Sequence, residues 1–414
     1  MPRKLPSFIA GFREYLEPMG SPVLFQHWTA LWTLSAALER RVWVHTKKMD
    51  LFPNIFVILS APPGIGKSTA MGPGRDLITS IAKDRVSMNS ITYASYVDDL
   101  RAAKRSIVDS VSQKAIDYYC LNIFSPEFQV LFPDYDTKLL GKMTDIYDGK
   151  EYGESRRGGE GKNTFHMERV LVTMLAGTTP EHMFSTFPET AWNTGFMSRT
   201  ILVWSTEVQL RSLFDEGGAG DRQLWEDLKH DIKLISDMYG KFVFDEEAKA
   251  LIDVFHRSSV FGGPPHPKHP RLLNYATRRS THMLKLMMLS AVDRAVEDYV
   301  LTRIDYDNAY QWLTAAEAEM PEMFKTQTTS GDVQITSELR HFVMEIYLRT
   351  KNTPVPEFML TKYLLSRTQA FRVQAIIDAA VAAKWLRKEP VGGRGVCYIP
   401  LADDPLDEDR ATQG

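Results

Sequence analysis

The segment from Ala61 to Ser68, which reads APPGIGKS, constrains the fold of this chain more than any other stretch. It follows an apolar, β-favouring run at residues 54–59 and leads into a helical start at Ser68. Strand, glycine-rich turn and helix, in that order, are the context of a phosphate-binding loop. Backbone amides of residues 64–67 are then free to wrap a polyphosphate, and the helix N-terminus adds partial positive charge. A chance turn before a helix is the alternative.

Different residues of the loop are expected to bind ATP and Mg²⁺. Lys67 is expected to reach the β- and γ-phosphates, and the Ser68 hydroxyl is expected to bind Mg²⁺. Ala61 occupies the position of the usual first glycine, which it can do if its φ is negative. The predicted nucleotide contacts in the loop are Pro63, Gly64, Ile65, Gly66, Lys67, Ser68 and Thr69.

Composition narrows the class of protein. A chain of 414 residues is expected to form two or three domains. The formal net charge of −3 argues against a surface coated in nucleic-acid-binding charge, although a local basic channel is compatible with it. Two distant cysteines, Cys120 and Cys397, have no metal-ligand spacing. No secretion signal or bilayer-spanning run is visible, so a cytoplasmic protein without membrane partners is expected.

The hydrophobic pattern predicts an α/β fold: a P-loop NTPase core with a mainly parallel sheet, a helical subdomain and a C-terminal winged-helix-like domain. Glycine and proline at 72–74 are expected to shorten the helix after the loop. The predicted strands are 41–44, 54–59, 115–124, 170–176 and 199–204, and helices are predicted at 22–38 and 96–107. The predicted domains are an N-terminal helical segment at 1–50, the core at 51–240, the helical subdomain at 241–325, a polar linker at 326–332, the winged-helix-like domain at 333–401 and an acidic disordered tail at 402–414.

Three residues at strand ends are candidates for chemistry. Glu127 follows the strand at 115–124, is predicted to activate the attacking water, and is predicted to bind Mg²⁺ through water. The usual aspartate is missing, with Ser125 near its place. Thr178, at the end of the strand at 170–176, is predicted to contact the γ-phosphate, whereas Thr179 is a good helix N-cap. Arg199, between a glycine-bearing loop and a strand, fits an arginine finger acting on a neighbouring subunit. For Glu127 and Arg199 the alternatives are a helix start and a structural salt bridge.

Residues 148–163 are rich in glycine and carry four cations, Lys150, Arg156, Arg157 and Lys162. A flexible basic loop at this place is expected to face a ring channel and grip DNA phosphates. An ordinary solvated loop is the alternative.

The chain resembles, over about residues 12–323, phage- and prophage-borne replicative helicase-like ATPases that are often encoded beside primases. The resemblance rests on Trp28 with the turn at 39–41, the phosphate loop, the strand end at 125–127, and the segments 144–149, 177–180 and 195–199. It implies a hexameric, RecA-like or AAA-like motor that uses ATP to move on single-stranded DNA in a bacterial host. It also implies that Lys67 and Ser68 hold phosphate and metal, that Glu127 activates water and that Arg199 acts in trans. Any primase would be a separate chain.

Three functions compete on this sequence. The leading hypothesis is an ATP-driven DNA translocase, a replicative helicase acting on single-stranded or forked DNA as a ring. The second is an ATPase that does not unwind, such as a helicase loader or replication initiator. The third is a small-molecule kinase, for which nothing resembles an acceptor site and in which a winged helix would be idle.

Overall fold

The computed structural model describes residues 2–87, 93–108, 113–131, 137–158, 161–188, 191–192, 194–209, 222–260, 267–296, 298–368, 370–391 and 395–401, without the side chains of 93–94, 155–158, 161–164, 260, 326–334, 337, 371 and 391. The chain divides into two compact units, Met1–Phe324 and Lys325–Gly414.

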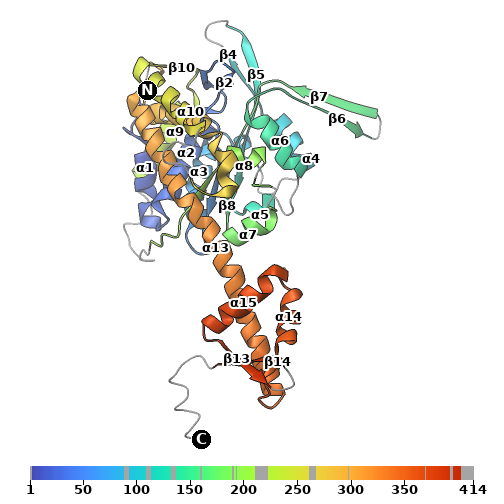
Figure 1. The fold of residues 1–414 in the computed structure, drawn as a ribbon. Helices are drawn as coiled ribbons and strands as arrows, with labels where there is room; N and C mark the ends of the chain where they lie inside the picture. Colours follow the sequence, from blue (N-terminus) through green and yellow to red (C-terminus); the bar gives the residue numbers. More distant parts are fainter. Residues whose placement is uncertain are drawn as a thin grey trace. The chain divides into compact units, whose positions relative to one another are not determined.

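A five-stranded sheet forms the centre of the first unit (Figure 1). Its order is β4-β5-β8-β3-β9, and every pair is parallel except the edge pair β4–β5. The strands are β3 (Phe56–Ser60), β4 (Lys104–Val108), β5 (Ala115–Ser125), β8 (Val170–Thr178) and β9 (Thr200–Trp204). Strands β3 and β8 are buried along their whole length, as expected for parallel strands covered on both faces. The α/β class and the mostly parallel sheet are confirmed.

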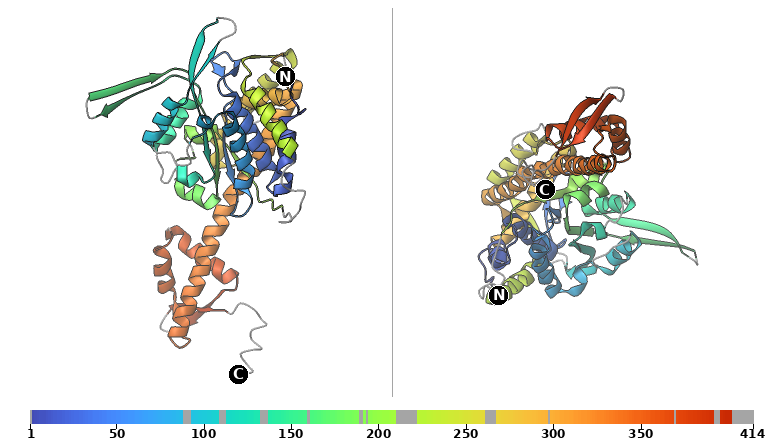
Figure 2. Two further views of the ribbon diagram at one scale, coloured as in Figure 1. Left: turned by 180° about the vertical axis from the view of Figure 1, so that it is seen from behind. Right: turned by 90° about the horizontal axis from the view of Figure 1, so that it is seen from below.

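Helices cover both faces of this sheet (Figure 2). One group is α1 (Phe8–Leu16), α2 (Val23–Leu38), α3 (Lys67–Ile81) and α9 (Arg222–Ser236); the other includes α4 (Tyr93–Ala102), α5 (Phe128–Leu131), α6 (Thr137–Tyr147), α7 (Pro180–Thr186) and α8 (Gly195–Arg199). Helix α2 is buried on almost all sides and contacts β3 and β8. The predicted N-terminal helical segment therefore packs on the core.

A second sheet joins distant parts of the chain. Its order is β11 (Val300–Leu301), β10 (Gly240–Phe244), β1 (Val42–His45) and β2 (Asp50–Leu51). The parallel pairing of β1 with β10 ties the N-terminal segment to residues beyond 240. Helices α10 (Glu246–Val260), α11 (Leu273–Ala276) and α12 (Arg279–Asp293) follow, and α12 contacts α2. Residues 241–324 thus belong to the same compact unit as the core, because their helices complete its hydrophobic interior.

Pro73 does not break the helix after the phosphate loop, contrary to expectation. Helix α3 continues from Lys67 to Ile81 with Pro73 inside it. A Cβ added at Gly74 would lie 2.7 Å from the side chains of both Thr29 and Thr33 on α2. Close packing of the two helices at this glycine compensates for the hydrogen bond that proline removes.

Two segments predicted as helix or loop are strands. Residues 104–107, predicted to continue a helix, form β4, because alternate exposed and partly buried side chains suit a sheet edge. The basic segment is a hairpin of β6 (Tyr152–Gly158) and β7 (Gly161–Met167) rather than an irregular loop. Figure 1 shows β6 and β7 extending beyond α4 and α6.

The second unit contains three helical stretches and a terminal hairpin, with one short strand between the first two helices. The end of α13 (Arg303–Arg349) is followed by β12 (Val355–Pro356), α14 (Glu357–Leu365), α15 (Ala370–Ala382), β13 (Leu386–Val391) and β14 (Gly395–Pro400). The sheet order is β12-β14-β13, and Leu360, Ile377 and Tyr398 lie in a separate small core. Residues 326–332, predicted as a linker from their polarity, are helical backbone within α13. The predicted tail at 402–414 lies outside the described residues.

A buried ionic cluster surrounds Glu39 at the end of α2. Glu39 has φ 51° and is completely buried. Its carboxylate accepts hydrogen bonds from Arg41 (3.2 Å) and from the Tyr118 hydroxyl (2.5 Å), and Arg105 lies within 3.8 Å. These contacts join α2, β4 and β5 and compensate for the unusual backbone conformation of a non-glycine residue.

Within the described part of the chain, no helix has the length and apolar character needed to cross a membrane.

Candidate functional site

The phosphate-loop segment connects the end of β3 to the start of α3. Gly64 and Gly66 have φ values of 82° and 83°, in the left-handed region that favours glycine. Ala61 keeps a negative φ, as its side chain requires, and is fully buried. Its amide donates to the Thr178 carbonyl at 3.3 Å, which anchors the first loop residue to β8. Alanine is therefore compatible with this loop.

Gly66 occupies the N-cap position of α3, where it has no side chain to offer as a cap. Among the described residues, no side chain forms a capping hydrogen bond at this helix start. Ser68 and Thr69 in this first turn are exposed, as are Pro63 and Gly64 in the loop, while Ile65 is partly exposed. Uncapped amides at a helix N-terminus, next to glycines in left-handed conformation, are a typical anion-binding arrangement.

Lys67 lies over the loop. Its ammonium donates to the carbonyl oxygens of Ala61 (2.8 Å) and Pro62 (3.1 Å). Partial burial lowers its pKa, and the carboxylates of Glu127 and Glu181 oppose this by raising it. Lysine is thus held beside two acids at the start of α3, where it can exchange carbonyl contacts for phosphate oxygens.

Glu127 reaches this place across the end of β8. Strand β8 lies between β5, which precedes Glu127, and β3, which precedes the phosphate loop. A Cβ added at Gly177 of β8 would lie 2.5 Å from the Pro126 carbonyl oxygen and 3.2 Å from Met71 Sδ of α3. The missing side chain therefore allows the turn after β5 to pass close to α3. Ser125 donates to the Glu127 carbonyl at 2.8 Å and supports this turn.

Glu181 is a second acid that sequence reasoning did not assign. It lies exposed in the first turn of α7, directly after β8, the neighbour of β3. Thr179 is the N-cap of α7 and accepts from the His182 amide, which confirms the capping alternative for this threonine. An acidic residue directly after an apolar strand was the signal that the sequence offered.

Thr178 lies beside the loop, as predicted from its strand-end position. Its side chain is buried, and its hydroxyl donates to the Thr179 carbonyl at 3.2 Å. Its own carbonyl accepts from Ala61. A contact between Thr178 and the γ-phosphate remains a proposal.

Arg199 lies at the opposite end of the strands from the phosphate loop. Thr200 pairs with Phe56 at the start of β3, whereas the phosphate loop follows Ser60 at its end. Arg199 is only 8% exposed and donates to Asp148 at 2.8 Å and to the Gly195 carbonyl at 3.0 Å. In this conformation Arg199 forms the structural ion pair that was the alternative reading of this residue. Its action on a neighbouring subunit stays a prediction.

Further cations surround the same carboxylate. Arg278 lies 3.7 Å from Asp148, and Lys285 donates to the Asn54 carbonyl at 2.8 Å. Lys285 is fully buried, and burial lowers its pKa well below the usual lysine value. These contacts join α6, α8, α12 and the start of β3.

Replacing Arg199 by alanine is therefore expected to destabilise the first unit by about 3–5 kcal/mol, since Asp148 would lose its closest partner in a mostly buried site. Thermal unfolding followed by circular dichroism measures this. Exposed Arg303, which also pairs with acids, supplies a control in Arg303→Ala, expected to leave the melting temperature nearly unchanged. Full stability of the Arg199→Ala protein, combined with loss of ATP hydrolysis, would favour the arginine finger over the structural ion pair.

The predicted DNA-binding cations lie on the hairpin and at its base. Lys150 is exposed just before β6. The strand register places Arg157 directly opposite Lys162 and Arg156 directly opposite Asn163. The side chains of these three cations lie outside the described residues.

The donors at the loop fit Mg²⁺ bound together with a nucleotide. Within the described residues, no three His, Cys, Asp or Glu side chains form a metal-binding group. Mg²⁺ in nucleotide sites commonly uses one or two carboxylates plus substrate phosphates and water. Ser68, Glu127 and Glu181 are oxygen donors of this kind at the start of α3 and the neighbouring strand ends.

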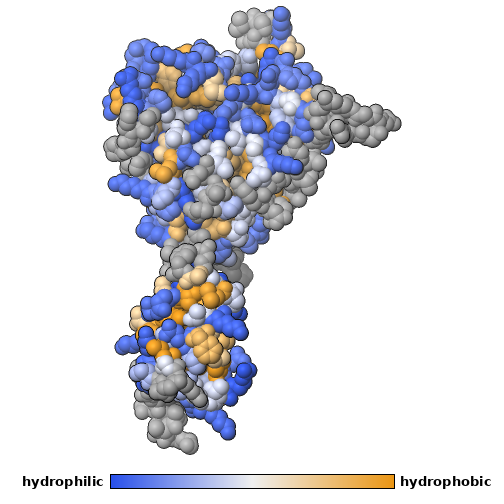
Figure 3. All heavy atoms as spheres, turned by 45° about the vertical axis from the view of Figure 1, so that its right-hand side comes forward, coloured by the Kyte–Doolittle hydropathy of each residue, from blue (hydrophilic) through white to orange (hydrophobic). Residues whose placement is uncertain are grey.

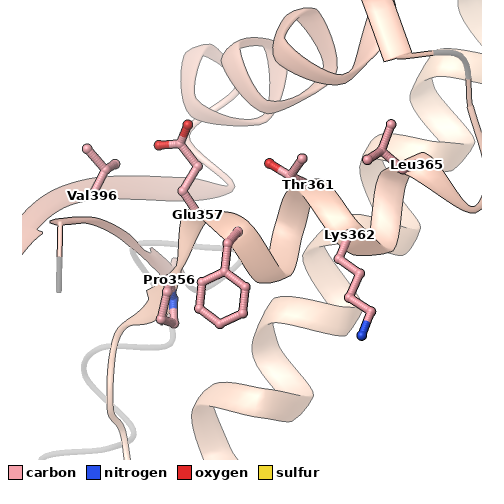
Figure 4. A pocket seen from close by; sticks show the side chains of 7 residues that line it. Pro356, Glu357, Thr361, Lys362, Leu365 and Val396 are labelled. Carbon is pink, nitrogen blue, oxygen red and sulfur yellow. The ribbon is translucent and has the colours of Figure 1, made fainter.

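The second unit carries a shallow groove of about 660 Å³ beside α14 (Figure 4). Phe358 and Leu365, which line it, are 68% and 52% exposed. Apolar surface is visible on this unit in Figure 3. Exposed apolar residues of this size favour a binding surface over ordinary solvated surface.

Comparisons with known proteins name no family for this arrangement. A scan against protein-family models finds no match, and a search of curated proteins finds no significant relative.

Proposed function

We propose that this protein is an ATP-driven DNA translocase, a replicative helicase of a phage or mobile element that moves on single-stranded DNA as a ring. The observation that carries the nucleotide part is the uncapped start of α3, with Lys67 and two carboxylates beside it. The competing ATPase and kinase functions share this site, so the DNA part rests on other residues.

Hydrolysis is assigned to residues of the chain itself. Amides of the loop and of the first α3 turn hold the phosphates, and Lys67 neutralises charge on the β- and γ-oxygens. A water oxygen attacks the γ-phosphorus, its proton passes to Glu127, and the bond to the β-phosphate oxygen breaks to release ADP. Bound Mg²⁺ supplies further neutralisation of the phosphate oxygens. Thr178 contacts the γ-phosphate from β8.

The hairpin supplies the proposed DNA contact. Arg157 and Lys162 are directly opposed in an antiparallel pair, and like charges in this position destabilise strand pairing. A phosphate backbone lying along the hairpin would relieve that repulsion. Arg156 and Lys150 add cations to the same element, on a chain whose overall charge is −3.

Replacing Arg156, Arg157 and Lys162 together by alanine is expected to weaken single-stranded DNA binding and to flatten its salt dependence, because fewer counterions are released. ATP hydrolysis measured without DNA should persist. Fluorescence anisotropy over a range of salt concentrations gives both quantities. Replacing exposed Lys47, Lys48 and Lys249 instead controls for net charge. Unchanged DNA affinity in the hairpin variant would return this segment to the solvated-surface alternative.

The second candidate, a loader or initiator, is favoured by the C-terminal unit. Three helices followed by a hairpin, with the sheet order β12-β14-β13, match a winged-helix order, which suits either duplex DNA or a protein partner. The exposed groove beside α14 favours a protein partner. Arg199 pairs with Asp148 of its own chain, so it would have to leave this ion pair to act in a shared active site of a ring.

Strand displacement separates the two candidates. With ATP and Mg²⁺, the protein is expected to displace the labelled strand of a forked duplex, and the Lys67→Ala protein is not. Forked DNA bound with ATP consumption but without displacement would favour the loader. Ring formation is read from particle images recorded with and without ATP.

A further inference from the structure

We propose that a cavity at the base of the β6–β7 hairpin binds one nucleotide unit of single-stranded DNA, with the base stacked against aromatic rings. The cavity has a volume of about 410 Å³. It is lined by Asp98 and Arg101 of α4, Lys104 of β4, Tyr119 of β5, and Phe165 and His166 of β7. The proposal rests on the DNA part of the proposed function.

This cavity is separate from the ATP site. Tyr119 and Ser125 lie on the same extended strand, six residues apart, so roughly 20 Å separates them. Glu127 follows Ser125 at the far end of β5. The cavity therefore lies toward the opposite end of the strands from the phosphate loop. ATP bound at the loop would not occupy it.

The lining matches a nucleotide better than it matches phosphate alone. Tyr119 and Phe165 are partly buried and offer ring faces, on which bases of any sequence stack. The Arg101 guanidinium lies 4.9 Å from the centre of the Phe165 ring. A patch that bound only phosphate would have no use for these rings, and a purely apolar ligand would have no use for the cations around them.

The charges indicate how many phosphates bind. Lys104 is paired with Asp117 at 2.7 Å, and His166 lies 3.6 Å from Glu151. Among the described residues, Arg101 forms no ion pair and contacts the Phe165 ring. The lining also contains the Asp98 carboxylate, three residues before Arg101 on α4. The lining therefore offers Arg101 for one phosphate at most, and stacking carries most of the affinity. This balance suits one nucleotide of a strand.

Position favours a strand over a free nucleotide. Phe165 and His166 lie on β7, the strand that also carries Lys162. A backbone held by the hairpin cations would pass the cavity as it leaves the hairpin. Duplex DNA is excluded as the ligand, since its paired bases stay stacked on one another and cannot enter.

The test is anisotropy with fluorescein-labelled oligothymidylate and the full chain. Phe165→Leu keeps apolar volume and removes the ring face, so it should weaken binding about tenfold without changing the salt slope. Arg101→Gln should also weaken binding and should lower the salt slope by about one. Val254→Ala, at an exposed apolar residue of α10 (65% exposed), is the control and should bind as wild type. If Phe165→Leu does not fold, Tyr119→Leu replaces it.

Each result decides the proposal. Wild-type affinity in both Phe165→Leu and Arg101→Gln overturns it, as does a wild-type protein that binds no oligothymidylate. The proposal is also overturned if Phe165→Leu and Arg101→Gln weaken binding of a blunt-ended duplex as much as they weaken binding of oligothymidylate. It is overturned too if thymidine monophosphate displaces the oligonucleotide when its concentration equals that of the oligonucleotide phosphates. If Phe165→Leu weakens oligonucleotide binding but the wild-type protein hydrolyses no ATP, the cavity remains a nucleotide-binding site and the proposed motor function is wrong. If Phe165→Leu hydrolyses ATP and binds the oligonucleotide as wild type does, only the proposed role of the cavity is wrong.

Discussion

Replacing Lys67 by alanine is expected to reduce ATP turnover by about a hundredfold or more, an effect of the size seen when a preorganised charge-stabilising group is removed. The ammonium now bonds to the carbonyls of Ala61 and Pro62 and is the only lysine in the loop. Without it, negative charge on the β- and γ-oxygens loses its nearest neutralising group. Phosphate release at saturating MgATP measures the effect.

Lys249→Ala is the matched control, because this lysine is exposed on α10 and pairs only with its helical neighbour Glu246. It should hydrolyse ATP as wild type does. Normal turnover in the Lys67→Ala protein would mean that the segment from Ala61 to Ser68 is a turn without a role in catalysis.

Replacing Glu127 by glutamine is expected to leave ATP binding intact and to slow hydrolysis by about 10²–10⁴-fold. The amide keeps the shape of the side chain, but it cannot accept a proton from the attacking water. Binding of a fluorescent ATP analogue and single-turnover hydrolysis separate the two effects.

Glu181→Gln distinguishes the two acids beside Lys67. If Glu127 is the base, Glu181→Gln should retain far more of the hydrolysis rate than Glu127→Gln. The opposite order would transfer the role of base to Glu181, and wild-type turnover in Glu127→Gln would show that the strand end at 125–127 was assigned the wrong chemistry.

Much of the core was predictable because its signals are local. The apolar runs that became β3, β5, β8 and β9 are too short and too apolar for surface helices, and each ends at a polar or glycine-containing turn. The phosphate loop carries its own geometry, since Gly64 and Gly66 occupy left-handed positions.

The arrangement of strands was not predictable in the same way. Nothing local to Glu127 or Gly177 shows that β8 lies between β5 and β3, or that the turn at Pro126 passes within contact of Gly177. Glu181 was missed for the same reason. Its closeness to Lys67 depends on which strand is next to β3, and strand order is set by tertiary packing.

Other residues have two plausible roles that the sequence alone cannot separate. An arginine between a loop and a strand suits both an arginine finger and a buried ion pair, and nothing local to Arg199 shows that Asp148 lies 2.8 Å from it. Pro73 should weaken a helix, yet Gly74 beside it allows α3 to pack closely on α2. The polar run at 326–332 lacks apolar residues, but polar residues continue a helix readily when both of its ends are packed.

Phosphate release with and without single-stranded DNA distinguishes a DNA motor from the other ATPases. Purified protein is expected to hydrolyse MgATP, single-stranded DNA is expected to raise the rate several-fold, and Lys67→Ala is expected to remove both the basal and the stimulated rates. A hydrolysis rate that does not respond to DNA would favour a kinase-like ATPase, and a wild-type protein with no ATP hydrolysis in either condition would show that it is not an ATP-driven translocase.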